Sequence, residues 1–258
     1  MGRAITPTDP RTRIAVEVRN GRHVVRTSGG LLRAQRLHGP DDRARVALVG
    51  QTALLLGGDR VELEVEVGPG ATLELSDIAG TVAYHGRGRP AAWHTTIRLG
   101  LGARLAYAGE PLILSDGADV TRTLTVDLAE GAAARLRETL VFGRAGEVGG
   151  RLDASTLLRR DGEEFHRERL VLDPDLRRRP GILADVRVLD SVLELGAEAR
   201  AKGPDHEART GAGRATLNPE DSRTARSART DVVTYTLLDP GSTLIRFLGA
   251  GLAESPVT

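Results

Sequence analysis

One short pattern occurs three times between residues 54 and 144 and constrains the fold more than any other feature of the sequence. The copies are VEVGPGATLEL (residues 65–75), IRLGLGARLAY (97–107) and VDLAEGAAARL (126–136), and a weaker copy, LDPGSTL, occupies residues 238–244. Apolar and polar residues alternate in both arms of a copy, which is the period of a strand with one buried face. Units that recur at a spacing of about thirty residues are typical of repeat architectures.

A Gly-Ala pair separates the two arms of each copy, and its glycine is Gly70, Gly102 or Gly131. Glycine adopts positive φ at little cost, so each pair predicts a tight corner in a hairpin-like unit, with little room for a side chain. A hairpin alone is only marginally stable in water, so several units must stack and share a core. The sequence therefore predicts a mainly β protein with few short helices, whose strands stack in an antiparallel or β-helix-like arrangement of two sheets.

The length of 258 residues suits one large β domain or two small ones, and we treat residues 1–258 as one domain. Its parts are a repeat-bearing β core over residues 14–172 and a less regular C-terminal part over 173–258. Within that part, residues 182–195 are apolar enough for a buried strand or for a helix. Residues 197–229 are rich in charge and poor in large apolar side chains, which predicts a long surface excursion or partial disorder.

Composition excludes several classes of function. The net charge is +1 and the basic residues are scattered among acidic ones, which argues against a nucleic-acid-binding surface. Without cysteine, the chain has no disulfide and no thiolate metal site. No apolar run approaches the roughly 20 residues that span a bilayer, and the N-terminus lacks the apolar segment of a signal peptide. We expect a cytoplasmic protein that binds neither nucleic acid nor membrane.

Standard catalytic motifs are absent, including the nucleophile elbow, the HExxH zinc motif and the P-loop, so we assign no catalytic residue. An enzyme that acts on polysaccharides with clustered carboxylates, such as Asp116 with Asp119, is the alternative. Aromatic residues make up only 3% of the chain, which weighs against sugar stacking. Structural roles are expected for the histidines, although His85 and His94 could approach each other across a hairpin.

Carboxylates beside apolar strands are the candidate metal-path residues, and they are Asp59, Glu110, Asp116 and Glu138. Facing inward, they would line a polar path suited to a divalent cation. In the other interpretation they are solvated or capping residues: Asp59 caps a turn, and Glu138 is held by an arginine such as Arg144. Gly57 and Gly58, directly before Asp59, indicate tight backbone geometry and close packing.

Several motifs follow one another in a fixed order. They are GLLRAQR (30–36), LLLGGDRVEL (54–63), VGPGA (67–71), AGTVAY (79–84), EPLILSDGA (110–118) and RETLVFGR (137–144). Together they resemble the UreD family of urease accessory proteins, also called UreH. The resemblance covers residues 14–172, with a looser similarity at 182–195 and 244–249. QTALLL replaces the usual Pro-rich segment before the two glycines, and Ala83 replaces a usual basic residue, so the branch is divergent.

The resemblance implies a mainly β fold with strands stacked in a helical, two-sheet arrangement. It also implies a non-enzymatic maturation factor that acts on apo-urease with UreF and the GTPase UreG, and that passes nickel through an internal tunnel. Nickel would be bound only transiently, and no cofactor would be tightly bound. We expect the apolar residues 244–252 to contact partners. The structural positions in the motifs and repeats are Gly57, Gly58, Gly70, Gly102, Gly131 and Arg144.

Overall fold

The structure, a computed structural model, describes residues 11–179, 186–196, 231–237, 239 and 241–249. The expectation for residues 197–229 lies outside the described residues. Strands dominate the described chain, and its single α-helix, α1 (Pro174–Arg177), has four residues. No helix in these ranges has the length and apolar character needed to cross a membrane.

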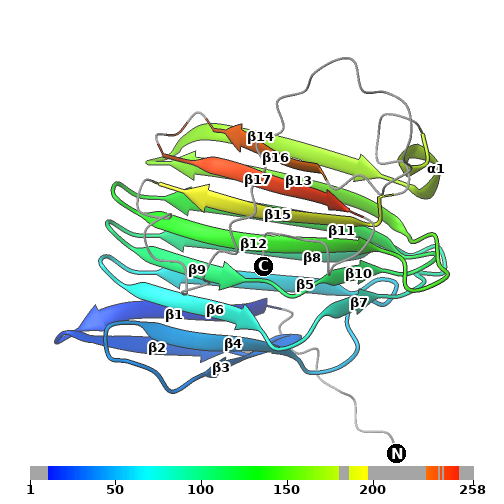
Figure 1. Cartoon of the computed structure of the whole chain (residues 1–258). Coiled ribbons are helices and arrows are strands. Elements are labelled where there is room, and N and C mark those ends of the chain that lie inside the picture. The colour runs from blue at the N-terminus through cyan, green and yellow to red at the C-terminus, as the bar shows by residue number, and fades with distance from the viewer. Residues whose placement is uncertain (1–10, 180–185, 197–230, 238, 240, 250–258) are drawn as a thin grey trace, which may run out of the picture.

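The strands form two sheets, which Figure 1 shows as two layers. The first sheet has the order β14-β13-β11-β8-β5-β1-β2. Its strands are β1 (Arg11–Arg19), β2 (Arg22–Ser28), β5 (Arg60–Val67), β8 (Ala91–Leu99), β11 (Asp119–Leu128), β13 (Arg151–Arg160) and β14 (Glu163–Leu172).

The second sheet has the order β16-β17-β15-β12-β9-β6-β4-β3, and the short strand β10 pairs with β12 and β7. Its strands are β3 (Leu32–Arg36), β4 (Ala44–Gly50), β6 (Thr72–Asp77), β7 (Thr81–Ala83), β9 (Arg104–Ala108), β10 (Leu112–Leu114), β12 (Ala133–Phe142), β15 (Val188–Leu195), β16 (Asp231–Thr236) and β17 (Thr243–Gly249).

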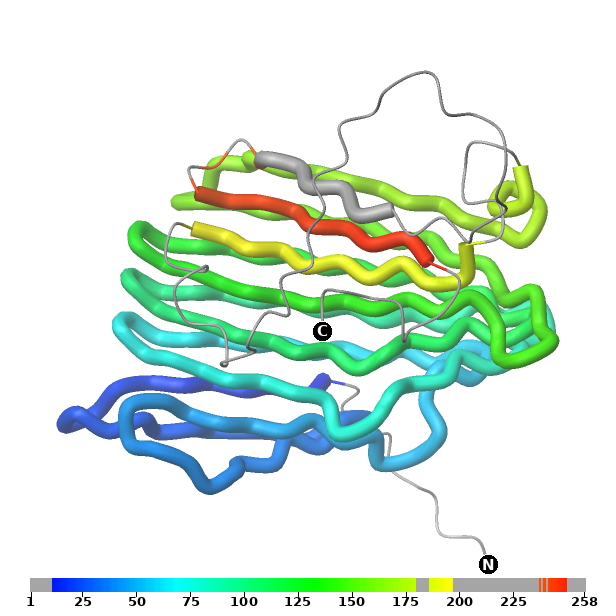
Figure 2. Tube along the Cα trace, viewed as in Figure 1, coloured from blue at the N-terminus to red at the C-terminus, as the bar shows by residue number. Residues whose placement is uncertain are grey.

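The repeat units build a coil that passes from one sheet to the other, as the tube in Figure 2 shows. The first arms, β5, β8 and β11, lie in parallel in the first sheet, where Val65, Ile97 and Val126 are register partners. The second arms, β6, β9 and β12, lie in parallel in the second sheet. The expected β-helix-like arrangement of two sheets is confirmed. The hairpin-like unit is wrong, because each arm pairs with the equivalent arm of the next unit.

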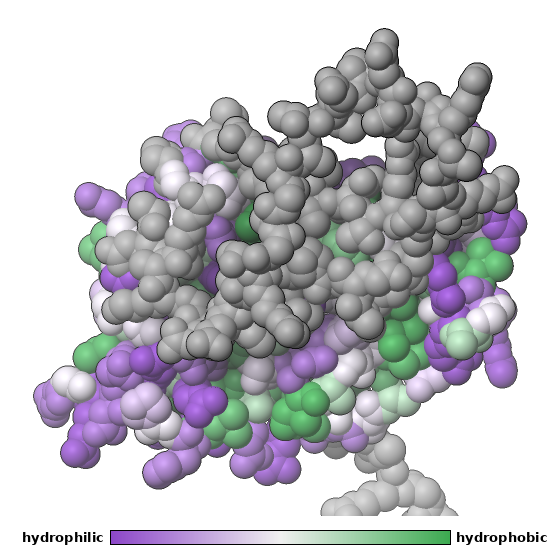
Figure 3. Space-filling model, viewed as in Figure 1, coloured by the Kyte–Doolittle hydropathy of each residue, from purple (hydrophilic) through white to green (hydrophobic). Residues whose placement is uncertain are grey.

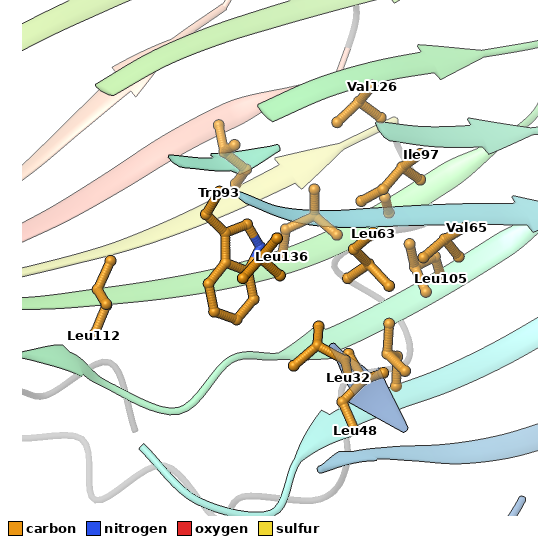
Figure 4. Close-up of a cluster of buried hydrophobic side chains, with 14 of the residues drawn as sticks. Leu32, Leu48, Leu63, Val65, Trp93, Ile97, Leu105, Leu112, Val126 and Leu136 are labelled. Carbon is orange, nitrogen blue, oxygen red and sulfur yellow. The ribbon is translucent and has the colours of Figure 1, made fainter. Parts of the chain in front are cut away.

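Alternation along every arm turns one set of side chains toward the space between the sheets, where they form a continuous core. Val65, Ile97 and Val126 are at most 2% exposed. Figure 4 shows Trp93 in a cluster of buried side chains whose other labelled members are leucine, isoleucine and valine. The Trp93 indole Nε1 donates to Thr95 Oγ1 at 3.1 Å, so its one polar atom is satisfied.

The corners require glycine because of the backbone conformation. Gly70, Gly102 and Gly131 have φ of +65°, +61° and +69°. The expectation of little room is wrong, since a Cβ at Gly70 or Gly102 would meet no atom within 4 Å and one at Gly131 none closer than 3.7 Å. Gly57 is the opposite case. A Cβ there would lie 2.2 Å from the Gly86 carbonyl oxygen, so two backbone segments approach closely.

The C-terminal part adds strands to the second sheet. The described residues of 182–195 include the strand β15 and no helix, and β15 pairs antiparallel with β12. β17 then pairs antiparallel with β15. In the described part of the expected contact surface at 244–252, Leu244 and Phe247 are 4% and 0% exposed and belong to the core, whereas Ile245 and Leu248 are half-buried, so the partner contact stays a prediction. Residues 250–252 lie outside the described residues.

Substitutions at the corners should therefore distinguish backbone strain from steric conflict. We expect Gly70→Val to lower the free energy of unfolding by about 1–3 kcal/mol, because a β-branched residue is held at positive φ. Gly70→Asn should cost less, because asparagine tolerates that conformation. Gly57→Ala should be at least as harmful as Gly70→Val. Urea unfolding of the purified variants measures all three, and equal losses for Asn and Val at position 70 would contradict strain as the cause.

Candidate functional site

A pair of charged side chains interrupts the apolar interior in the middle of the stack. Residues two apart along a strand face the same side, and we call this their parity. Arg122 on β11 has the same parity as the buried Val120 and Val126, so it points between the sheets. Glu138 on β12 likewise has the parity of the buried Leu136 and Leu140. The two form an ion pair across the two sheets, and their side chains retain 19% and 28% exposure. Solvent therefore reaches this pair although it lies between the layers.

A second pair of the same kind lies nearer the β14 end of the stack. Arg246 on β17 donates two hydrogen bonds of 2.8 Å to the carboxylate of Glu168 on β14. The Arg246 Nε also donates to Ser191 Oγ at 3.1 Å. The hydrogen bond from Arg246 lowers the pKa of Glu168 below its ordinary value, so this carboxylate stays ionised at neutral pH.

Both pairs line one cavity of about 50 Å³, which is large enough for water. Leucines from both sheets supply its apolar walls. His166, two residues before Glu168 on β14, lines the same cavity. Its Nε2 is buried and has no hydrogen-bond partner in the described part of the chain. The cavity thus contains two ion pairs and an imidazole nitrogen that is available for a ligand.

The polar residues continue beyond this cavity toward an interruption in the second sheet. Tyr107 on β9 donates from its hydroxyl to Asp77 Oδ1 at 3.1 Å, and the Glu110 backbone N–H donates to Asp77 Oδ2 at 3.1 Å. Burial raises the pKa of Asp77 to about 6 and that of Tyr107 well above its ordinary value. These residues line a smaller cavity of about 20 Å³, beside the gap between β9 and β10.

The two cavities share Tyr107, Arg122, Arg137 and Glu138 in their walls, so they adjoin. Six of the polar side chains that line them form what we call the interior polar row: Asp77, Tyr107, Arg122, Glu138, Glu168 and Arg246. The row extends between the sheets from the gap in the second sheet toward β14. Chemically, it offers carboxylates and hydroxyls to a cation inside an otherwise aliphatic stack.

Two of the four predicted carboxylates lie away from both cavities. Asp59 Oδ2 accepts a hydrogen bond from the Leu56 backbone N–H at 2.9 Å, so Asp59 caps a turn. Exposed Asp116 accepts from the backbone N–H groups of Val148 and Gly149 at 3.0 and 2.7 Å, and so holds a loop. Both positions therefore fit the interpretation as caps.

The other two lie at the smaller cavity. Glu138 points inward and Glu110 is exposed, yet both line its wall. Glu138 is held by Arg122, whereas Arg144 pairs with Glu147 at 2.6 Å, so the expected arginine was the wrong one. The structure thus brings Glu110 and Glu138 together.

The remaining candidates have local structural partners. Gly58 has φ of +93°, and its N–H donates to the Pro90 carbonyl at 3.0 Å. Asp119, the second carboxylate of the proposed enzymatic pair, forms an ion pair with Arg151 at 3.0 Å. His94 Nδ1 lies 2.7 Å from Thr123 Oγ1, and His85 Nδ1 accepts from the Arg87 backbone N–H. Within the described ranges, no group of three or more histidine and carboxylate side chains could hold a metal.

Parity could have identified the residues that motif reading missed. Asp77 continues the inward series of Leu73 and Leu75 on β6. Arg122 falls in the inward series of β11, and a charged residue in such a series is unusual because it must be paired or solvated.

The raised pKa of Asp77 predicts a pH-dependent stability. Its folded-state pKa exceeds the unfolded value, so between about pH 4 and pH 6 the folded chain holds a proton that the unfolded chain releases. Stability from the protonated carboxyl is present at low pH and is lost as the pH rises toward 6. A rise of about two pH units in the pKa of Asp77 corresponds to a change of about 3 kcal/mol in the free energy of unfolding.

We therefore expect Asp77→Asn to gain stability relative to the unsubstituted chain as the pH rises from about 4 to 7, by up to about 3 kcal/mol. Urea unfolding across this range measures the difference. Asp41→Asn, at an exposed site, is the matched control for the loss of one carboxylate. A difference between Asp77→Asn and the unsubstituted chain that is constant with pH would contradict the assignment.

Comparison with known proteins places this architecture in a family. The sequence model of the family described as UreD urease accessory protein matches residues 9–255. The chain is 45% identical over 212 residues to the urease accessory protein UreD 1 of Streptomyces griseus subsp. griseus, which covers 81% of this chain and 82% of that protein.

Two further relatives carry the same description. Identity is 32% over 230 residues with the urease accessory protein UreD of Frankia casuarinae, covering 83% of this chain and 68% of the relative. It is 43% over 149 residues with UreD 1 of Saccharopolyspora erythraea, covering 57% and 58%. The family match spans nearly the whole chain and agrees with the motifs and the fold, so the chain belongs to the UreD family of urease accessory proteins.

Proposed function

We propose that this chain is a non-catalytic scaffold that binds apo-urease together with UreF and the GTPase UreG and assists the insertion of nickel. Membership of a family of urease accessory proteins supports a role in urease maturation. The observation that carries the finer proposal is the interior polar row, which crosses the stack between the gap at β9–β10 and the β14 end. A cytoplasmic location and the absence of nucleic-acid or membrane partners go with this proposal.

The chemistry of the row suits a cargo that must be released. A carboxylate in an apolar interior is costly unless it is paired or solvated, so the row is retained at a cost to stability. Oxygen ligands bind nickel weakly compared with thiolate or imidazole, and the chain has no cysteine. Nickel would therefore be held transiently as cargo, and no tightly bound cofactor is needed.

Among the predicted carboxylates, Glu110 and Glu138 are the ones we propose to contact nickel. They line the smaller cavity together with Asp77, at the gap in the second sheet. Asp59 and Asp116 would act on the path only by fixing loops at the strand ends, through their hydrogen bonds to backbone N–H groups.

The test uses cells that produce urease, UreF and UreG together with this chain. We expect Glu110→Gln/Glu138→Gln to lower both the activity and the nickel content of the purified urease roughly tenfold, since each glutamine keeps the size of glutamate and loses its charge. Co-purification of the variant with UreF and apo-urease should be unchanged.

Glu164→Gln is the control, because Glu164 forms an exposed ion pair with Arg167 away from both cavities. Full nickel content in urease matured by the double variant would contradict the conduit. Failure of the unsubstituted chain to co-purify with UreF and apo-urease would contradict the scaffold.

A further inference from the structure

We propose that Arg122 and Arg246 are exchangeable counter-cations, each of which neutralises one glutamate in the cavity until a divalent cation takes its place. This inference rests on the proposed function and names the element that regulates entry to the same path. Each guanidinium would then act as a gate: it excludes cations from its carboxylate at rest and moves aside during transfer.

The arrangement of the pairs supports this role. Arg122 extends from the first sheet to Glu138 on the second, and Arg246 extends from the second sheet to Glu168 on the first. Both pairs line the same cavity between the layers. A cation between the sheets therefore meets carboxylates that are already paired, and it must compete with the guanidinium for each of them.

Each arginine also has a second, uncharged contact that remains when the carboxylate is taken. The Arg122 guanidinium carbon lies 5.6 Å from the centroid of the Trp93 ring, within the range of a cation–π interaction. The Arg246 Nε donates to Ser191 Oγ at 3.1 Å. These contacts remain when the carboxylate is taken by a cation, and they offset part of the cost of separating a buried ion pair.

The environment of Glu168 adds selectivity for nickel over magnesium or calcium. His166 and Glu168 are two residues apart on β14, so both face the cavity. The unpartnered His166 Nε2 supplies an imidazole ligand beside the carboxylate. Imidazole suits nickel and other transition metals, whereas magnesium and calcium prefer oxygen ligands alone. Exchange at this second pair should therefore favour nickel.

Competition from an internal guanidinium weakens the apparent affinity for a cation, because only the fraction of molecules with a vacated carboxylate binds it. Removal of the arginine should then tighten binding. We expect Arg122→Gln to raise the affinity of the purified full chain for Ni²⁺ roughly tenfold or more, measured by equilibrium dialysis against nickel chloride. Arg122→Gln/Glu138→Gln should return to the affinity of the unsubstituted chain or below it.

Arg144→Gln is the matched control, because Arg144 pairs with Glu147 outside both cavities, and it should leave Ni²⁺ affinity unchanged. Should Arg122→Gln not accumulate as folded protein, Arg246→Gln tests the same exchange at the second pair. Its gain should be larger for Ni²⁺ than for Mg²⁺, and His166→Ala in that background should abolish the difference. Unchanged or weaker Ni²⁺ binding in the folded arginine variant would overturn the proposal.

The binding measurement needs no urease, so it separates this inference from the proposed function. Tighter binding by Arg122→Gln, with no effect of the unsubstituted chain on urease maturation, would support the exchange and overturn the maturation role. Normal maturation with no change in affinity in any folded arginine variant would overturn the exchange and leave the maturation role standing.

Discussion

The in-register pairing of equivalent arms is the constraint on which the rest of this structure depends. Val65, Ile97 and Val126 are register partners because β5, β8 and β11 are aligned without an offset. Side chains alternate between the two faces of a strand, so a shift of one residue would turn every interior side chain outward. The alignment therefore fixes the core and also the few charged side chains that share its parity.

Alternation and the recurring Gly-Ala pair were enough to predict stacked strands, because both are local properties of the chain. The partner of each arm is not local. The arms of one unit, such as residues 65–67 and 73–75, have the same pattern whether they pair with each other or with the next unit. The interior polar row was partly predicted for a similar reason. Glu138 was found from its position beside an apolar strand, but Asp77 and Arg122 are found only by following which residues of a strand face the interior. Asp59 precedes its strand, where parity carries no information about burial.

The charged side chains inside the aliphatic stack affect how stable its interior can be. A layer of aliphatic side chains alone would be at least as stable as a layer that contains Arg122 and Glu138, since burial of such a pair is often no more favourable than apolar packing. The two cross-sheet pairs lie where the cavities occur, so the loss of packing and the presence of charge coincide. This coincidence supports the transient path for a hydrated ion that we propose for this chain.

The strands that end the coil run antiparallel to their neighbours, in contrast to its central turns. At the first end, β2 and β3 lie antiparallel to β1 and β4, and at the other end β14 and β15 reverse direction beside β13 and β12. Exposed arginines, including Arg22 on β2 and Arg33 on β3, lie along the first edges, and the tip of the β1–β2 hairpin is hydrophilic in Figure 3. A parallel template is thus interrupted at both ends, and charge discourages a further strand from joining. The strands at the two ends therefore limit the stack to a fixed number of turns, and they keep separate molecules from joining end to end into a fibre.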